Sequence, residues 1–287
     1  MKTGTFIVFF LLVMYASGQI QHPKASPFTT VVQEIGLSKI KVEYSRPAIR
    51  GRKIFGNLVP YGRIWRVGAN ASTKITVDAD MNVMGKMLPK GTYALYAFPR
   101  ADVWEVVFHK NTTHWGDGRK AYNSDEDVFR VRIVPEKTSY LQENFLITFD
   151  AITHNSLKML WIWEHTKIVI PITVDTHVLM LQEIATKLSD NPTAQTYYEA
   201  ARYLQEQKTE YPKALEYVNK ALDVGGDTYY FHRVKSLVQA ALHDYGEAIV
   251  SAQKSMELAA IQEKDEFVRM NRKNIDRWTE LIKKDKK

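Results

Sequence analysis

The sequence predicts a protein in two parts, an antiparallel β-sandwich followed by tetratricopeptide-like helical hairpins. Between residues 39 and 173, short runs of alternating apolar and polar residues are separated by Gly, Pro, Asn and Asp, a pattern typical of antiparallel strands. After Asp175 the apolar period becomes helical, and similar residues recur 34 positions apart. These two periodicities place a β domain before a helical one.

The N-terminus predicts export. Lys2 precedes an apolar run over residues 6–15, and Ala16-Ser17-Gly18 supplies the small residues of a cleavage site. A run of about ten apolar residues is too short for a transmembrane helix, which needs roughly 20. The chain also has no cysteine, which excludes a disulfide framework and thiol catalysis. We expect a soluble periplasmic or secreted protein with no membrane span after signal cleavage.

The β part contains eight or nine strands without a helical stretch between them, which favours a sandwich or barrel. Pro89-Lys90-Gly91 predicts a tight turn, because Pro fixes φ and Gly accepts the positive φ that follows. The predicted strands are 40–44, 74–77, 82–84, 92–98, 103–108, 128–134, 144–150, 157–163 and 167–173.

The C-terminal part contains an internal repeat. Tyr211, Ala214, Leu215, Lys220 and Ala221 recur as Tyr245, Ala248, Ile249, Lys254 and Ser255, which is the tetratricopeptide spacing. A plain helical bundle with a coincidental spacing is the alternative. Three predicted helices cover residues 193–207, 228–242 and 262–284, and two more begin at residues 211 and 245.

These patterns divide the chain into five segments. They are a signal peptide at 1–18, an N-terminal linker at 19–36, a β-sandwich domain at 37–174, a connecting helix at 175–191 and a tetratricopeptide-like domain at 192–287.

Positive charge is concentrated in one segment. Residues 39–66 carry eight Lys or Arg against the single acid Glu43, an excess equal to the net charge of +7 of the whole chain. Arginine binds carboxylate and phosphate through two parallel hydrogen bonds, so we predict a site for an anionic or polar small molecule or glycan. Alternatively, these arginines bridge carboxylates and carbonyls between strands. The predicted ligand-binding residues are Arg46, Arg52, Tyr61, Trp65, Arg66 and Asn70.

Catalytic signatures are weak. The chain has no His-Glu-x-x-His, Gly-x-Ser-x-Gly, P-loop or dinucleotide motif. His109 and His114 are weak catalytic candidates, for a hydrolase acting on an envelope glycan or phosphate ester. These histidines, with His154 and His165, could converge on a metal, but isolated histidines more often pack or face solvent. We therefore expect binding rather than catalysis, with no metal and no cofactor.

The acidic run Asp125-Glu126-Asp127 lacks the spaced oxygen ligands and the Gly of a calcium loop, and we interpret it as a solvated turn. Helical repeats usually contact proteins, so a protein partner is expected for the C-terminal part. No nucleic-acid motif is present, and nucleic acid is not an expected partner.

Five short motifs follow one another in the β part. They are Tyr44-Ser45-Arg46-Pro47, Gly51-Arg52-Lys53-Ile54-Phe55-Gly56, Leu58-Val59-Pro60-Tyr61-Gly62, Trp65-Arg66-Val67-Gly68-Ala69-Asn70 and Gly91-Thr92-Tyr93. Together they resemble the bacterial exported family known as domain of unknown function 2911. The resemblance covers about residues 37–175, and the helical tail is similar to that of longer members.

Three positions depart from the family pattern. Ala71 stands where the family has Glu, and Val67 and Ser72 stand where it has Thr and Ala. The resemblance implies export and a β-rich fold, and it implies no established activity, ligand or catalytic residue.

Overall fold

The computed structural model describes residues 22–116 and 121–285, which form two compact units. The first unit ends at Thr176 and the second begins at His177. An antiparallel β unit therefore precedes a set of helices, as the sequence predicts. The predicted signal peptide, residues 1–18, lies outside the described residues.

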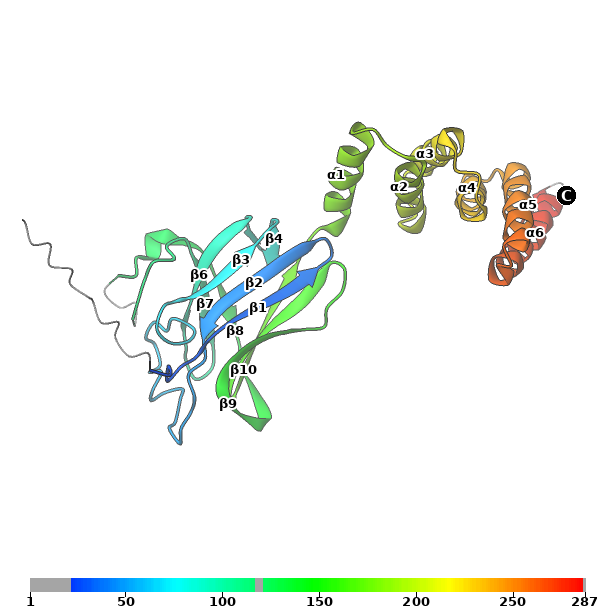
Figure 1. Ribbon diagram of the computed structural model, residues 1–287. Helices are drawn as coiled ribbons and strands as arrows, with labels where there is room; N and C mark the ends of the chain where they lie inside the picture. Colours follow the sequence, from blue (N-terminus) through cyan, green and yellow to red (C-terminus); the bar gives the residue numbers. More distant parts are fainter. Residues whose placement is uncertain (1–21, 117–120, 286–287) are drawn as a thin grey trace, which may run out of the picture. The chain divides into compact units, whose positions relative to one another are not determined.

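Two antiparallel sheets build the β unit (Figure 1). The first has the order β1-β2-β3-β6-β7-β8, and the second has the order β5-β4-β10-β9. The strands of the first sheet are β1 (Phe28–Ile35), β2 (Ser38–Ser45), β3 (Thr73–Val77), β6 (Gly91–Phe98), β7 (Trp104–His109) and β8 (Asp127–Ile133). Those of the second are β4 (Met81–Val83), β5 (Lys86–Leu88), β9 (Glu136–Asp150) and β10 (Ser156–Thr173).

Alternation along the strands decides which side chains enter the core. In β2, Ile40, Val42 and Tyr44 are buried, whereas the intervening Lys41 and Glu43 are partly exposed. This is the period-2 pattern of a strand with one face against a core.

Two segments differ from the sequence prediction. The linker predicted at 19–36 is wrong for residues 28–35, which form edge strand β1. Its apolar alternation is weak, because Phe28 and Val32 are exposed and backbone pairing with β2 holds the strand. The strands predicted at 157–163 and 167–173 are one strand, β10, whose register against β9 shifts around Glu164. In the sequence, the polar residues of such a bulge are similar to those of a turn, which is why the pattern predicts two strands.

A tyrosine hydroxyl joins the two sheets inside the core. The Tyr44 hydroxyl on β2 accepts a hydrogen bond from the Ile147 N–H at 2.8 Å and donates one to the Ile147 carbonyl at 3.2 Å on β9. Burial raises the pKa of Tyr44 above its ordinary value, so the phenol keeps the proton that it donates. This side chain gives a hydrogen-bond partner to two buried backbone groups of β9.

In the helical unit, helices that follow one another in the sequence pack together as antiparallel pairs. Helices α2 and α3 pack together, as do α4 and α5, and α6 packs against α5. The described helices are α1 (Thr176–Ser189), α2 (Ala194–Glu206), α3 (Tyr211–Val224), α4 (Tyr229–Ala241), α5 (Tyr245–Ile261) and α6 (Asp265–Asp285). No helix among the described residues is both long enough and apolar enough to cross a membrane.

The 34-residue repeat marks equivalent buried positions. Ala214 in α3 and Ala248 in α5 are both fully buried, as are Ala221 and its counterpart Ser255. Small side chains at these positions let paired helices approach closely. The Ser255 hydroxyl is satisfied because it donates to the Tyr229 carbonyl and accepts from the Asn271 side chain.

We predict that Tyr44→Phe lowers the free energy of unfolding by about 1–3 kcal/mol, because it removes two hydrogen bonds to buried backbone groups. Urea unfolding followed by fluorescence measures this change. Tyr140→Phe on β9 is the control, since Tyr140 is 52% exposed. Equal effects of the two substitutions would show that the hydroxyl bridge does not stabilise the sandwich.

Candidate functional site

After β2 ends at Ser45, the basic segment continues as a loop attached to the opposite sheet. The Phe145 N–H donates to the Pro47 carbonyl and the Ile49 N–H donates to the Glu143 carbonyl, both at 2.9 Å. The Arg46 guanidinium donates through Nε to the Phe145 carbonyl at 3.0 Å. Residues 46–49 therefore run alongside β9 and are held there by backbone bonds.

Trp65 fixes the other end of this segment. It is 6% exposed, and it exchanges two backbone hydrogen bonds with Ala97 of β6 at 2.8 and 2.9 Å. Its indole Nε1 donates to the Gly68 carbonyl at 3.3 Å. Gly68 has a φ of 148°, and a Cβ there would lie 2.9 Å from the Ser45 carbonyl oxygen, so only glycine fits this turn.

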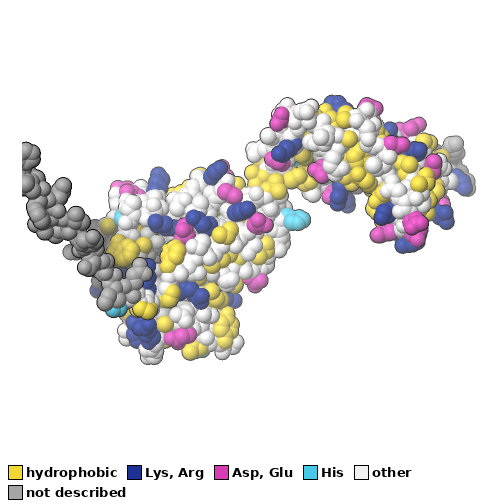
Figure 2. Space-filling view, viewed as in Figure 1, with side chains coloured by type: hydrophobic (Ala, Val, Ile, Leu, Met, Phe, Trp, Pro, Cys, Tyr) yellow, Lys and Arg dark blue, Asp and Glu magenta, His cyan; other side chains and the backbone are white. Residues whose placement is uncertain are grey.

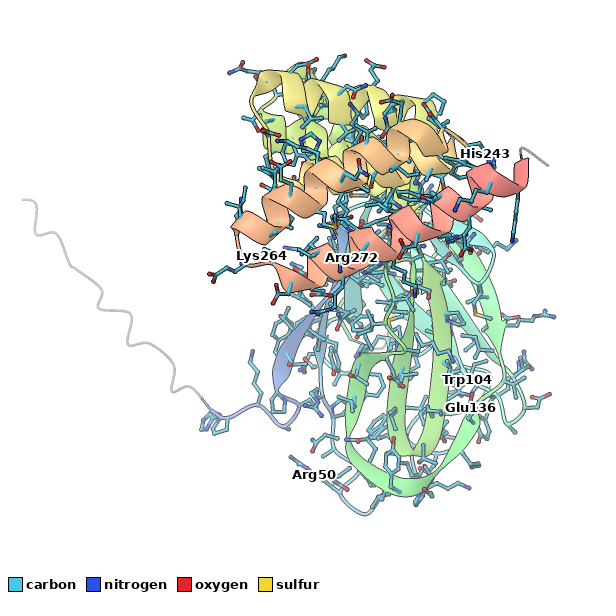
Figure 3. The ribbon with its side chains drawn as sticks, turned by 90° about the vertical axis from the view of Figure 1, so that its right-hand side faces the viewer. Arg50, Trp104, Glu136, His243, Lys264 and Arg272 are labelled. Carbon is cyan, nitrogen blue, oxygen red and sulfur yellow. The ribbon has the colours of Figure 1, made fainter. Side chains whose placement is uncertain are left out.

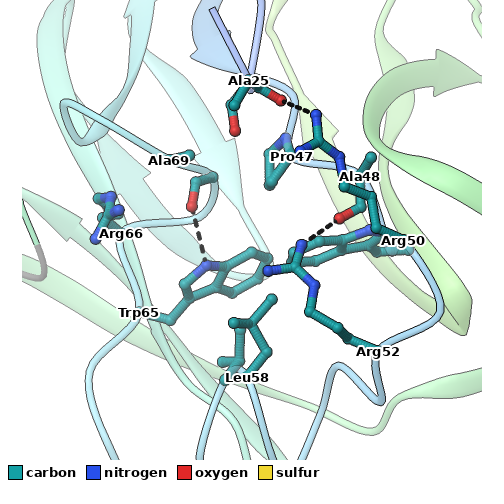
Figure 4. A pocket seen from close by; sticks show the side chains of 13 residues that line it. Ala25, Pro47, Ala48, Arg50, Arg52, Leu58, Trp65, Arg66 and Ala69 are labelled. Carbon is teal, nitrogen blue, oxygen red and sulfur yellow. Dashed lines mark hydrogen bonds between the residues drawn. The ribbon is translucent and has the colours of Figure 1, made fainter.

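A cavity of about 310 Å³ lies between these two ends of the segment (Figure 4). Arg50, which contributes to it, lies at the loop end of the β unit (Figure 3). The lining residues are Ala25, Ser26, Pro47, Ala48, Arg50, Arg52, Leu58, Val59, Trp65, Arg66, Gly68, Ala69 and Trp163.

Among the described residues, all charged side chains in this lining are arginines. Arg50 donates to the Ala25 carbonyl at 3.4 Å, and Arg52 donates to the Ile49 and Ala48 carbonyls at 2.9 and 2.6 Å. Within the described part of the chain, neither Arg50 nor Arg52 forms an ion pair with a carboxylate. The Glu143 carboxylate accepts a hydrogen bond from the Arg50 backbone N–H at 2.9 Å. Arg50 and Arg52 thus bring positive charge to the cavity that no carboxylate of the described residues pairs with.

The lysines of the same basic segment are arranged differently. Lys39 lies 3.6 Å from the carboxylate of Glu34, and Lys41 lies 2.8 Å from that of Glu43. Figure 2 shows basic and acidic side chains intermingled on the face that carries β1 and β2. These pairs are exposed and contribute little to stability, so the lysines belong to a mixed solvated surface.

Three of the six predicted ligand-binding residues line the cavity, namely Arg52, Trp65 and Arg66. The other three lie outside its lining. Arg46 bonds to β9, and the Asn70 amide donates to the Ser45 hydroxyl and the Ser26 carbonyl. Tyr61 is 47% exposed.

Among the lining residues that sequence reasoning missed are Arg50 and Trp163. Arg50 belongs to the basic segment, but nothing in the pattern separates it from its neighbours. Trp163 comes from β10, almost one hundred residues further on, and only the fold brings it there.

The two candidate histidines lie close together, at a different place from the arginines. Their ring centroids are 5.5 Å apart, and neither His109 nor His114 lines the arginine cavity. His154 and His165 are exposed and do not join them.

The histidine pair lies on the outer face of the six-stranded sheet. His109 pairs with Ala94, and the next alternate pair joins Val107 to Tyr96. Ala94, Tyr96 and Val107 form a small core that is separate from the interior of the sandwich. The solvated turn predicted at 125–127 is wrong for Asp127, whose side chain is 9% exposed and lies 2.9 Å from His109 Nδ1. Its environment depends on strand pairing, which the acidic composition does not reveal.

Residues 26–172 match the sequence model of a family described as a protein of unknown function (DUF2911). The match covers just over half of the 287 residues. The chain belongs to this family. The DUF2911 region contains both the arginine cavity and the histidine pair, apart from Ala25 at its margin. No curated protein and no solved structure matches the chain.

We predict that Arg46→Gln lowers the free energy of unfolding by about 1.5–3 kcal/mol, because a charged donor to a partly buried carbonyl is lost. Arg63→Gln is the control from the same segment, since Arg63 is exposed and does not line the cavity. It should change the free energy by less than about 0.5 kcal/mol. Chemical denaturation measures both, and a neutral Arg46→Gln would remove the structural role of this arginine.

Proposed function

We propose that the β unit binds a small anionic or polar molecule in the arginine cavity. The observation that carries this proposal is that Arg50 and Arg52 line the cavity and form no ion pair with a carboxylate of the described residues. Two cations held within one small cavity repel each other, and an anion relieves that repulsion. A ligand with a carboxylate or phosphate group is the natural complement.

The arginines keep donors for such a ligand. A guanidinium carries five N–H donors in a fixed fork, and the bonds of Arg52 to Ile49 and Ala48 use only its Nε and one Nη atom. These bonds also orient the side chain before the ligand arrives, which reduces the entropy that binding costs. Arg52 is therefore the residue on which we expect affinity to depend most.

The volume of the cavity and its uncharged lining residues indicate the size of the ligand and the character of its uncharged part. A volume of about 310 Å³ lies at the small end of the range for ligand pockets, roughly 300–1,000 Å³. Pro47, Leu58 and Trp65 offer apolar surface beside the charges. A sugar acid or sugar phosphate combines the two properties, since its ring packs on apolar surface while its charge faces the arginines.

A hydrolase acting on an envelope glycan or phosphate ester is the alternative. In that reading His109 or His114 acts as acid or base while the arginines hold the charge of the substrate. Binding is favoured because neither histidine lines the cavity that holds the arginines.

We also propose that the helical unit contacts a protein partner and that the protein works in the periplasm or outside the cell. Support for the partner comes from the paired helices and from apolar side chains on α5, where Val250 and Ile261 are 57% and 73% exposed. Support for export comes from the apolar pattern of residues 6–15.

The anion proposal predicts selective binding of charged probes. Titration calorimetry with inorganic phosphate, a hexose 6-phosphate, a hexuronate and the uncharged hexose compares them directly. Binding of the charged probes should weaken as salt rises, because their attraction to partly exposed arginines is screened. Arg52→Gln should reduce the affinity about 10- to 100-fold, since hydrogen bonds to charged groups contribute about 1.5–3 kcal/mol.

Arg63→Gln serves again as the matched control and should bind as the unchanged protein does. The proposal fails if Arg52→Gln binds the charged probes with full affinity, or if the uncharged hexose binds as well as the hexuronate.

A further inference from the structure

We propose that His109, His114 and Glu126 bind a divalent transition-metal ion, and that Zn²⁺ fits this set of ligands well. Each side chain offers one ligand atom, and these atoms lie within 4.8 Å of one another. The site is separate from the arginine cavity and does not depend on the function proposed for it.

His109 provides the strongest evidence. Its side chain is fully buried, and its Nδ1 lies 2.9 Å from Asp127 Oδ1. A carboxylate at this distance accepts the Nδ1 proton, which leaves a lone pair on Nε2. That Nε2 atom is buried and has no hydrogen-bond partner among the described residues.

The Nε2 atom instead faces a second carboxylate. Glu126 Oε2 lies 3.3 Å away, without the geometry of a hydrogen bond. Two acceptors at this distance repel each other unless a positive ion lies between them. A proton on Nε2 would be the other solution, but it would not point along a hydrogen bond to Glu126. A metal ion on the Nε2 lone pair can bind Glu126 at an angle, so the carboxylate need not lie along the N–H direction.

His114 is brought to the same place by its loop. Its carbonyl accepts from the Ser72 N–H at 3.3 Å, and the Gly116 N–H donates to the Asn70 carbonyl at 3.1 Å. The His114 ring is fixed by Tyr96, whose hydroxyl lies 2.8 Å from Nδ1. A histidine held in this way through one ring nitrogen coordinates a metal through the other.

Asp127 is arranged as a support for His109 rather than as a ligand. Its Oδ2 accepts from the Tyr122 hydroxyl at 2.7 Å and from Arg130 Nε at 2.8 Å. A carboxylate behind a metal-binding histidine sets the tautomer and the direction of the ring.

The ligand set indicates the class of ion. Two imidazoles and one carboxylate suit Zn²⁺ and its neighbours in the first transition row, whereas Mg²⁺ and Ca²⁺ prefer oxygen ligands alone. Three protein ligands leave a coordination position open, as in catalytic zinc sites. The side chain of Glu126 is 38% exposed, which gives the ion a path from solvent.

Calorimetric titration of the full-length, untagged, chelator-treated chain with Zn²⁺ tests the proposal, with Mg²⁺ titrated in parallel. We expect one Zn²⁺ per chain and no comparable binding of Mg²⁺. Glu126→Gln and His114→Gln should each weaken Zn²⁺ binding at least tenfold, and Asp127→Asn about 10- to 100-fold. The control is His165→Gln, an exposed histidine of the same unit that should leave binding unchanged.

Cobalt adds a readout that folding alone does not change. Bound Co²⁺ should give visible absorption bands that shift or vanish in Glu126→Gln, a partly exposed position whose substitution should preserve the fold by circular dichroism. Failure of the wild-type chain to bind Zn²⁺ at one site would overturn the proposal. So would Zn²⁺ binding in Glu126→Gln equal to that of wild type, or equal weakening in His165→Gln.

Discussion

Trp65 packs edge-on against Phe55, Trp104 and Phe145 and lies nearly parallel to Trp163, with ring centroids 5.1 to 6.0 Å apart. These rings come from both sheets and from the basic segment between β2 and β3. Burial of large aromatic surface is a strong stabilising term, so the indole ties this long segment to the sandwich. The arginines are carried on the same segment, and Arg50, Arg52 and Arg66 line one cavity together with Trp65.

The pleat of one sheet separates the two candidate sites. Along β6, Tyr96 belongs to the small core beneath the histidines, whereas its neighbours Leu95 and Ala97 point to the other face. The arginine cavity and the histidine pair thus have different neighbouring side chains, although the same sheet contributes to both. A change that alters one site can leave the other intact.

The sequence predicted the parts of the fold that rest on local pattern. Strand alternation located β2 and β6 within two residues, and the repeat of Ala214 at Ala248 located α3 and α5. The sequence pattern did not predict β1, because backbone pairing with β2 holds this strand. Its exposed Phe28 and Val32 give no alternation of core-facing residues.

The candidate sites divide in the same way. Clustering of basic residues pointed to Arg52 and Arg66, which do line the cavity. The environments of Trp163 and Asp127 depend on contacts between segments far apart in the chain, and no spacing rule reports such contacts. The attachment of Arg46 and Tyr44 to β9 spans 99 and 103 residues. During synthesis, the contacts between the arginine segment and β9 therefore cannot form until β9 has left the ribosome. Their formation also requires closure of a long loop, which costs chain entropy before the contacts contribute.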